Sequence, residues 1–199
     1  MIFGNKRMPS PLKLILEGNL LERTATTKFL GVYLDEKLNW NCHLNFVRNK
    51  ISKGLGMLGR CRNILSNDIL LTMYFSLIYP YLIYCCIVWG GASATALSKL
   101  QVLQNRAVRL ITRSPFQSSA DPLFKQLRLL KLTDIRKLQI VLFMYKSKNL
   151  LLPNSCLGYC LINNRISYNM RNSQDFLTPS FRTNIREQSI SIWVPGCGN

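Results

Sequence analysis

A chain of 199 residues with 48% hydrophobic side chains is long and apolar enough to bury a core, typically as one domain. It carries 26 lysines and arginines against 9 aspartates and glutamates, a formal net charge of +17. Such an excess repels itself in a compact state, so a polyanionic partner is the economical explanation. Nucleic acid is the first candidate and an anionic membrane surface is the second.

The seven cysteines are an odd number, and the start of the chain has no signal-peptide pattern, which argues against a disulfide-stabilised secreted protein. We expect reduced thiols in an intracellular protein, with the choice between nucleus and cytoplasm left open. Cys156 and Cys160 have the spacing of half a metal site, but the sole histidine, His43, is far away in sequence. No second pair completes four ligands, so we expect no metal in this chain.

The first 38 residues contain short strand patterns. Residues 13–16 and 20–21 flank the turn residues Glu17, Gly18 and Asn19, which predicts a hairpin. Residues 28–34 predict a further short strand, with Gly31 where another group can approach the backbone closely. Because these strands are too few for an independent sheet, we expect residues 1–38 to be the remnant of a domain that begins upstream.

From Trp40 the apolar residues change to helical spacing, with one face made of Trp40, Leu44, Val47, Ile51, Leu55 and Leu58. Gly54, Gly56 and Gly59 either weaken this helix or let another backbone pack closely. The next element, residues 69–89, has no charged residue, and Ser66, Asn67 and Asp68 form a helix-capping cluster before it.

A helix that is apolar all round is a membrane span or the centre of a core. Pro80 lies in the middle of residues 69–89 and should kink or break the helix. The four tyrosines are dispersed through the stretch, whereas membrane helices hold such rings at their ends. We therefore expect a buried helix pair, and a single membrane span with a basic flank is the alternative.

Three more helices are predicted downstream. One runs from about Ala94 to Thr112, and a short one opens near Pro122. The last is capped by Thr133 and ends before Pro153. Its predicted apolar side consists of Ile135, Leu138, Val141, Leu142 and Tyr145. Residues 154–199 are polar and aperiodic, so we expect a poorly ordered basic tail.

Several short motifs occur in a fixed order: residues 28–35 (KFLGVYLD) with Leu38, Trp40 and His43, residues 80–84 (PYLIY) with Trp89 and Gly90, residues 103–109 (LQNRAVR), residues 143–146 (FMYK), and Leu152 with Pro153. In this order and spacing they resemble the region just after the catalytic palm in reverse transcriptases of non-LTR, LINE-type retrotransposons. The resemblance spans most of residues 1–153. It implies a palm remnant at residues 1–38 and a helical thumb and connector at residues 39–153.

The resemblance also implies roles for residues. Phe29, Leu30 and Gly31 match the primer grip, a β-hairpin that supports the 3′ end of the primer. The alternative for these three residues is a strand that merely packs against the first helix. The basic helices are expected to hold the template–primer backbone, because few acids balance them, and a merely solvated basic face is the alternative. The candidate phosphate contacts are Lys50, Lys53, Arg60, Arg62, Arg106, Arg109 and Arg113.

One departure from the family matters for the chemistry. Its polymerase reaction uses two metal ions, with Mg²⁺ expected for the full-length parent enzyme, held partly by a Tyr-x-Asp-Asp motif upstream of the primer grip. No Asp-Asp dipeptide occurs here, and the adjacent acids Asp35 and Glu36 are interpreted as a solvated strand end. No catalytic residue is therefore assigned. His43 is expected to be a packed or capping residue, and the glycines at 54, 56 and 59 match a dinucleotide fingerprint only in spacing.

The sequence thus predicts a mainly α-helical fold after a small N-terminal β-hairpin. The expected function is the thumb region of a retrotransposon RNA-directed DNA polymerase, which binds RNA or DNA template–primer beside palm and fingers domains absent from this chain. Alone, the chain is expected to bind nucleic acid and not to polymerise. A stand-alone basic nucleic-acid-binding protein and the single-span membrane protein are the alternatives.

Overall fold

The computed structural model describes residues 15–153, so the expectations for Cys156, Cys160 and the basic tail lie outside the described residues. Within that range the chain is mainly helical, with two small antiparallel strand pairs near its start, which confirms the predicted fold class. The elements in chain order are β1 (Ile15–Leu16), β2 (Asn19–Leu20), β3 (Thr26–Phe29), β4 (Val32–Asp35), α1 (Asn41–Cys61), α2 (Asn67–Leu77), α3 (Tyr79–Ile83), α4 (Cys86–Trp89), α5 (Ala94–Ile111), α6 (Ala120–Gln126) and α7 (Leu132–Lys148).

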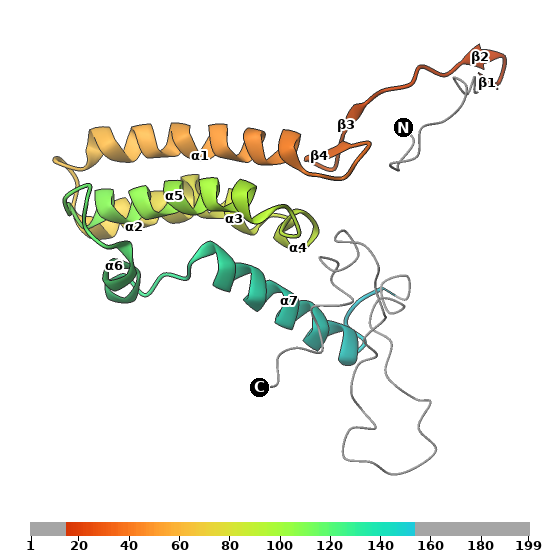
Figure 1. The fold of residues 1–199 in the computed structure, drawn as a ribbon. Helices are drawn as coiled ribbons and strands as arrows, with labels where there is room; N and C mark the ends of the chain where they lie inside the picture. Colours follow the sequence, from red (N-terminus) through yellow and green to blue (C-terminus); the bar gives the residue numbers. More distant parts are fainter. Residues whose placement is uncertain (1–14, 154–199) are drawn as a thin grey trace, which may run out of the picture.

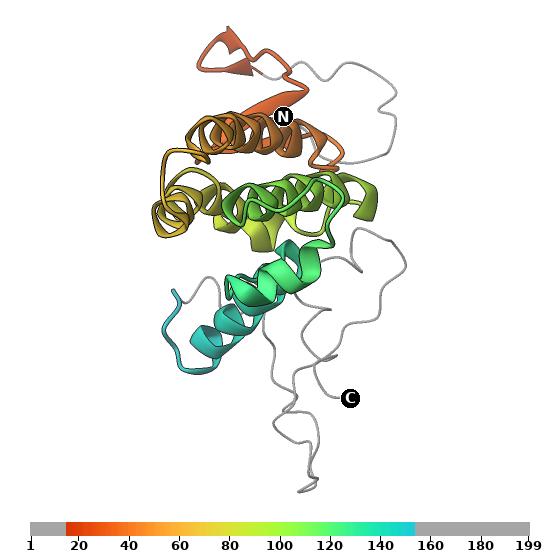
Figure 2. The same cartoon turned by 90° about the vertical axis from the view of Figure 1, so that its left-hand side faces the viewer.

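The helices are stacked in layers (Figures 1 and 2). Helix α1 forms one outer layer, α2, α3 and α5 form the middle layer, and α7 crosses below them. Arg113, just after α5, bonds to carbonyls just after α1, so the C-terminal ends of these two helices lie together. Asn41 and Ala96 line one small cavity, so the N-terminal ends also meet and α1 runs parallel to α5.

Both strand pairs are tight hairpins. β1 pairs with β2 around Glu17 and Gly18, as the sequence predicts, and the four residues of these two strands are exposed. The single strand predicted at residues 28–34 is wrong, because the chain reverses there and Phe29 pairs with Val32. Leu30 and Gly31 both have positive φ, 45° and 82°. That is the two-residue turn whose twist matches a β-hairpin, and glycine at its second position makes it possible.

The central stretch supplies the core. Leu70, Tyr74, Ile78, Leu82 and Cys86 follow one another four residues apart, and each is at most 1% exposed. Together with the buried stripe of α1 they pack into one hydrophobic cluster, which confirms the predicted burial of both elements. Within the residues that the structure describes, no helix combines the length and hydropathy that crossing a bilayer would require.

The stretch is broken twice, not once. Helix α2 ends at Leu77, and Pro80 lies in the first turn of α3, where its missing N–H costs no intrahelical bond. A second break at Tyr84 and Cys85 separates α3 from α4, and the expected helix pair is therefore three helices. Cys85 has a φ of 51°, and nothing in its side chain predicts that conformation.

Gly54 is the point where α1 touches the middle layer most closely. A Cβ atom at this position would lie 3.1 Å from the Ile78 Cγ1 atom and 3.2 Å from the Leu77 carbonyl oxygen. A Cβ at Gly56 or Gly59 would meet open space. Of the two interpretations offered by the sequence, close approach thus holds for Gly54 alone, and the other two glycines only lower helix propensity.

Replacing Gly54 by valine should lower the free energy of unfolding by about 1–3 kcal/mol, because the added carbons overpack the contact between α1 and α2. Gly56→Ala is the matched control in the same helix. It should raise the free energy of unfolding by roughly 0.5–1 kcal/mol, since alanine restores helix propensity. Urea unfolding followed by circular dichroism measures both, and a neutral Gly54→Val would show that α1 can move away without cost.

The predicted apolar side of α7 is wrong for four of its five residues. Ile135 is buried, but Leu138, Val141, Leu142 and Tyr145 are 40–62% exposed. The buried residues are instead Leu132, Ile135, Ile140, Met144 and Ser147. Apolar residues lie around most of α7, so its own pattern does not reveal which stripe the bundle covers.

The predicted cap of α7 is also wrong. Its N-cap position is Lys131, not Thr133, and no side chain there caps the helix. The first backbone N–H, that of Leu132, donates instead to the Oε1 atoms of Gln101 and Gln104 at 3.0 and 2.9 Å. Two side chains of α5 thus satisfy the start of α7, which fixes one helix against the other.

Candidate nucleic-acid interface

The tip of the β3–β4 hairpin presents apolar side chains to solvent. Phe29 is 63% and Leu30 is 74% exposed, whereas Val32 and Asp35 of β4 are buried. The strand β4 packs against α1, as the alternative interpretation expected. The three residues matched to the primer grip therefore form an exposed, tightly turned loop. Their part in holding a primer stays a prediction.

Tyr84, from the break between α3 and α4, holds this tip. Its hydroxyl donates to the Leu30 carbonyl oxygen at 2.5 Å. A Cβ atom at Gly31 would lie 3.5 Å from the Tyr84 ring, an ordinary van der Waals contact, so it is the φ of 82° rather than lack of space that favours glycine here. Sequence reasoning missed this contact, because 54 residues separate Leu30 from Tyr84 and no local pattern links them.

A second anchor fixes strand β4. The Tyr33 backbone N–H donates to His43 Nδ1 at 3.4 Å. The His43 ring packs against the indole of Trp89, with 5.9 Å between ring centroids. The Trp89 Nε1–H donates in turn to the Tyr84 carbonyl oxygen at 2.7 Å. The hairpin is therefore attached to α1 through one residue and to the α3–α4 junction through another.

His43 is 2% exposed, which is the environment of a packed histidine. Because Nδ1 accepts a hydrogen bond, the neutral ring carries its proton on Nε2. Burial lowers the pKa of His43 from its ordinary value of 6.5, since the charged ring would lose its hydration. The neutral form is thus the one that the folded hairpin requires.

The stability of the fold should fall as pH is lowered from about 7 to 5, since an unfolded His43 takes up its proton near pH 6.5 and the folded one only at lower pH. Above that window the contribution is fully present. His43 is the sole histidine, and ordinary carboxylates titrate near pH 4, so the change in stability between pH 7 and 5 should come mainly from His43. Urea unfolding at several pH values measures the slope. In His43→Phe the slope should vanish, and an unchanged slope would contradict the assignment.

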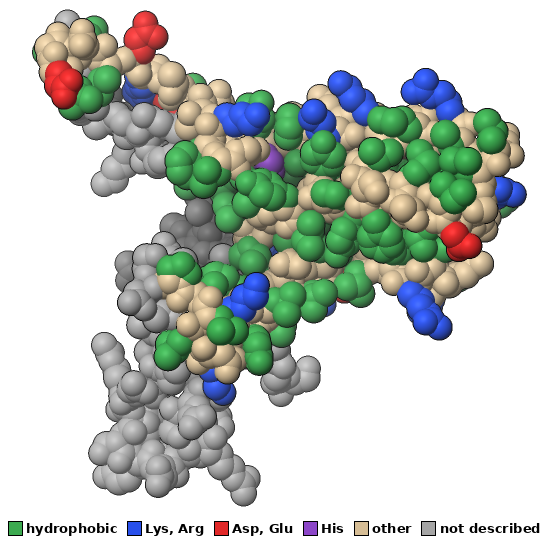
Figure 3. All heavy atoms as spheres, turned by 180° about the vertical axis from the view of Figure 1, so that it is seen from behind, with side chains coloured by type: hydrophobic (Ala, Val, Ile, Leu, Met, Phe, Trp, Pro, Cys, Tyr) green, Lys and Arg blue, Asp and Glu red, His purple; other side chains and the backbone are tan. Residues whose placement is uncertain are grey.

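The predicted basic residues of α1 fall on its outer side. Lys53 and Arg60 are exposed and Lys50 is half-buried, all away from the stripe that packs into the core. Seen from behind, lysine and arginine side chains line the edge of the molecule over α1 (Figure 3). Arg62 lies just beyond the helix, half-buried at its C-cap. A phosphate backbone could approach this edge without displacing core residues.

On α5 the three predicted arginines differ. Arg106 is exposed, and its guanidinium forms no hydrogen bond or ion pair with the described residues. Arg109 Nε donates to the Ser118 carbonyl oxygen at 2.8 Å, and its guanidinium lies over the Phe116 ring. Arg113 donates to the carbonyl oxygens of Arg62 at 3.1 Å and Leu65 at 2.9 Å. Arg109 and Arg113 therefore have structural tasks, and Arg106 is the best placed of the three for a phosphate.

The described residues do not suit a two-metal site. Among them, no three histidine, cysteine, aspartate or glutamate side chains converge closely enough to hold an ion. Asp35 Oδ1 accepts the backbone N–H groups of Lys37 and Asn39, and Glu36 pairs with Arg23 at 3.1 Å. Both adjacent acids are thus occupied within the turn after β4, and no polymerisation step is assigned to them.

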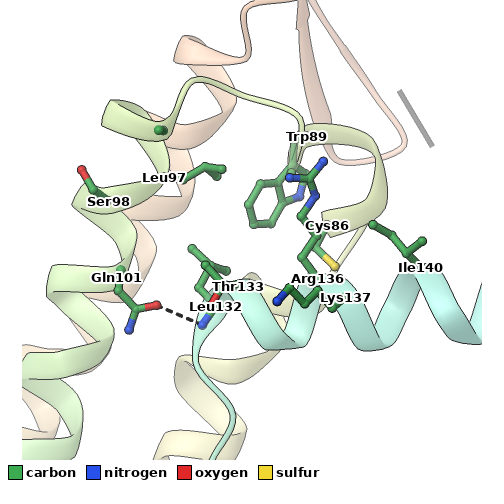
Figure 4. Close-up of a pocket in the computed structure, with 12 residues that line it drawn as sticks. Cys86, Trp89, Leu97, Ser98, Gln101, Leu132, Thr133, Arg136, Lys137 and Ile140 are labelled. Atoms are coloured by element: carbon green, nitrogen blue, oxygen red, sulfur yellow. Dashed lines mark hydrogen bonds between the residues drawn. The ribbon is translucent and has the colours of Figure 1, made fainter. Parts of the chain in front are cut away.

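A cavity of about 350 Å³ lies between α4, α5 and α7 (Figure 4). Its walls include Cys86, Trp89, Leu97 and Ile140, with Arg136 beside them. Burial raises the pKa of the Cys86 thiol to about 11, so it is protonated and unreactive at neutral pH. No activated nucleophile or general base accompanies it in this wall.

Comparison with known proteins finds relatives of one kind. The chain is 31% identical over 144 residues to the RNA-directed DNA polymerase from the mobile element jockey of Drosophila melanogaster. The matched region covers 70% of this chain and 15% of that protein. It is 30% identical to the probable RNA-directed DNA polymerase from transposon BS of the same species, over 57% of this chain and 13% of the relative. The jockey polymerase of Drosophila funebris is 35% identical over 51% of this chain and 11% of that protein.

These matches confirm the resemblance inferred from the ordered motifs, because all three relatives are polymerases of non-LTR mobile elements. The chain spans less than a sixth of the length of each. No protein-family model matches the chain. No solved structure matches it either.

Proposed function

We propose that this chain, which is similar in sequence to the RNA-directed DNA polymerases of non-LTR mobile elements, works as the thumb segment of such an enzyme. It binds template–primer nucleic acid and positions it, while the bond-forming chemistry takes place elsewhere. The exposed tip of the β3–β4 hairpin is the single observation that best supports this role. An apolar loop anchored by the Tyr84 hydroxyl, beside a basic helix, is suited to support a primer end.

The carboxylates of the described residues are the reason for assigning binding to this chain and polymerisation to another part of the enzyme. The described residues offer no convergent carboxylates, so the Mg²⁺ ions of polymerisation would be held by another part of a longer protein. The relatives are several times longer than this chain, which leaves ample length for such a part. The basic residues here would contact phosphates and read no sequence, since phosphate contacts set position and base contacts set specificity.

Binding of the purified chain to a primer–template duplex should weaken steeply with salt and depend little on sequence, because each neutralised phosphate adds roughly 0.9 to the slope of log affinity against log salt. Changing Lys53 and Arg106 together to glutamine should lower that slope by up to about 2, if each contacts one phosphate. Fluorescence anisotropy at several salt concentrations measures the slope. Circular dichroism should show an intact fold, since both residues are exposed and glutamine is a good helix former.

Lys146→Gln with Lys148→Gln is the matched control, because it removes the same charge from the exposed end of α7. This control should leave the slope within error of the parent chain apart from a small long-range effect. An equal loss in both pairs would show that only net charge matters and that Lys53 and Arg106 belong to no specific interface. The absence of any duplex binding would contradict the proposal outright.

A further inference from the structure

We propose that the hairpin and α1 together form a binding site for an unpaired nucleotide of single-stranded nucleic acid, built from the rings of Tyr33 and Phe46 and the ammonium groups of Lys28 and Lys50. The inference deepens the proposed function, because it names a ligand class for the surface beside the hairpin. The four residues come from three elements, β3, β4 and α1, so only the fold brings them together.

The two rings form a shared apolar platform. The Tyr33 and Phe46 centroids lie 5.2 Å apart, with their planes inclined by 52°. Both side chains are half-buried, so part of each ring remains accessible to solvent. Aromatic faces that are fixed at their edges and open to solvent are what a nucleobase requires for stacking.

Two lysines surround this platform. Lys28 Nζ lies 5.7 Å from the Tyr33 ring centroid and 5.8 Å from that of Phe46. Lys50 Nζ lies 5.5 Å from the Phe46 centroid. Among the described residues neither ammonium group forms an ion pair. Both positive charges therefore remain available to an anionic ligand.

The relative strengths favour a bound nucleotide over an internal cluster. At an exposed site a cation over a ring is worth roughly a 2- to 5-fold change in an equilibrium constant. Stacking one base on an aromatic side chain is worth roughly 5- to 150-fold. A base can therefore displace a lysine head from the ring at small cost. The displaced ammonium group, on its flexible stem, then reaches the flanking phosphate.

The platform selects an unpaired nucleotide. Within a duplex both faces of a base are covered by its stacked neighbours, so only a single-stranded or splayed base can offer its face to Tyr33 and Phe46. Two lysines supply point charges without a planar fork, which suits phosphates and does not distinguish among bases. The site should therefore accept single strands with little sequence preference.

The test compares an oligothymidylate with an abasic strand of the same length and charge. The parent chain should bind the oligothymidylate more tightly, by roughly 5- to 150-fold if one base stacks. Phe46→Leu should remove most of the preference for the oligothymidylate and leave the salt slope unchanged. Phe46→Tyr should retain the preference, because it keeps an aromatic ring at this position. Lys28→Gln with Lys50→Gln should lower the salt slope by up to about 1.4, at roughly 0.7 for each single-strand phosphate.

Phe75→Leu is the matched control, because this exposed phenylalanine of α2 lies outside the platform. It should leave the base preference unchanged, and thermal melting should show that each variant folds. Equal binding of the oligothymidylate and the abasic strand would overturn the inference, and so would a preference that survives Phe46→Leu. If duplex binding persists in either case, the proposed thumb function stands. Base-dependent single-strand binding without duplex binding would support the platform and contradict the thumb function.

Discussion

Replacing Gln104 by leucine should lower the free energy of unfolding by about 2–4 kcal/mol, because the Tyr74 hydroxyl and the Leu130 carbonyl would lose the amide that satisfies them, while the Leu132 N–H would keep only Gln101. Gln104 donates through Nε2 to the Tyr74 hydroxyl at 3.0 Å and to the Leu130 carbonyl oxygen at 2.9 Å. Its Oε1 accepts the N–H of Leu132. Leucine fills a similar volume but makes none of these bonds. Urea unfolding followed by circular dichroism measures the loss.

Two variants separate the parts of this network. Gln101→Leu should cost much less, since Gln101 is half-exposed and Gln104 would still accept the Leu132 N–H. Tyr74→Phe combined with Gln104→Leu should cost less than the sum of the two single changes, because the buried hydroxyl left unpaired by the second change is gone. Additive losses would show that the bond between Tyr74 and Gln104 contributes nothing.

Replacing Trp89 by alanine should lower the free energy of unfolding by about 3–5 kcal/mol, the usual cost of truncating a fully buried aromatic side chain. The change also removes the Nε1–H bond to the Tyr84 carbonyl and the ring contact with His43. The total free energy of unfolding of a small domain is about 5–15 kcal/mol, so this variant should unfold at a much lower urea concentration than the parent chain. Val88→Ala on the same helix is the matched control.

Val88 is 49% exposed, so its truncation should change the free energy of unfolding by less than about 0.5 kcal/mol. Trp89→Phe should give an intermediate loss, because it keeps an aromatic ring and deletes the bond to Tyr84. If Trp89→Ala were as mild as Val88→Ala, the contact between α4 and α1 would have no part in holding the core together.

Burial was predictable from the sequence for α1 and for the central stretch, but not for α7. The stripe of α1 needs only helical geometry and an apolar partner, and the central stretch is too apolar to lie in water. Pro80 marked the first break for a local reason, its missing N–H. The second break, at Cys85, was not predictable, because a cysteine has no intrinsic preference for positive φ. The Trp89 Nε1–H bond to the Tyr84 carbonyl oxygen lies at this break and comes from a residue further along the chain.

The candidate interface shows the same division. The exposed loop of Phe29, Leu30 and Gly31 was located by its motif, and the basic outer side of α1 by its charges. What the sequence could not reveal is which arginines are already engaged, since the bonds of Arg113 to the end of α1 depend on the parallel packing of α1 and α5. The contact of Tyr84 with the hairpin is equally non-local.

The contacts that anchor the hairpin form a closed ring, which begins and ends at the hairpin itself. From Leu30 the contacts lead to Tyr84, then to Trp89, then to His43, and through the backbone of Tyr33 back to the same hairpin. The hairpin is therefore connected to the bundle by two sets of contacts, one through His43 and one through Tyr84, and both lead to Trp89. The connection through His43 involves two buried rings, whereas the connection through Tyr84 depends on one hydrogen bond of a side chain that is 51% exposed. The hairpin is thus joined to the buried core on one side and to an exposed side chain of the α3–α4 junction on the other.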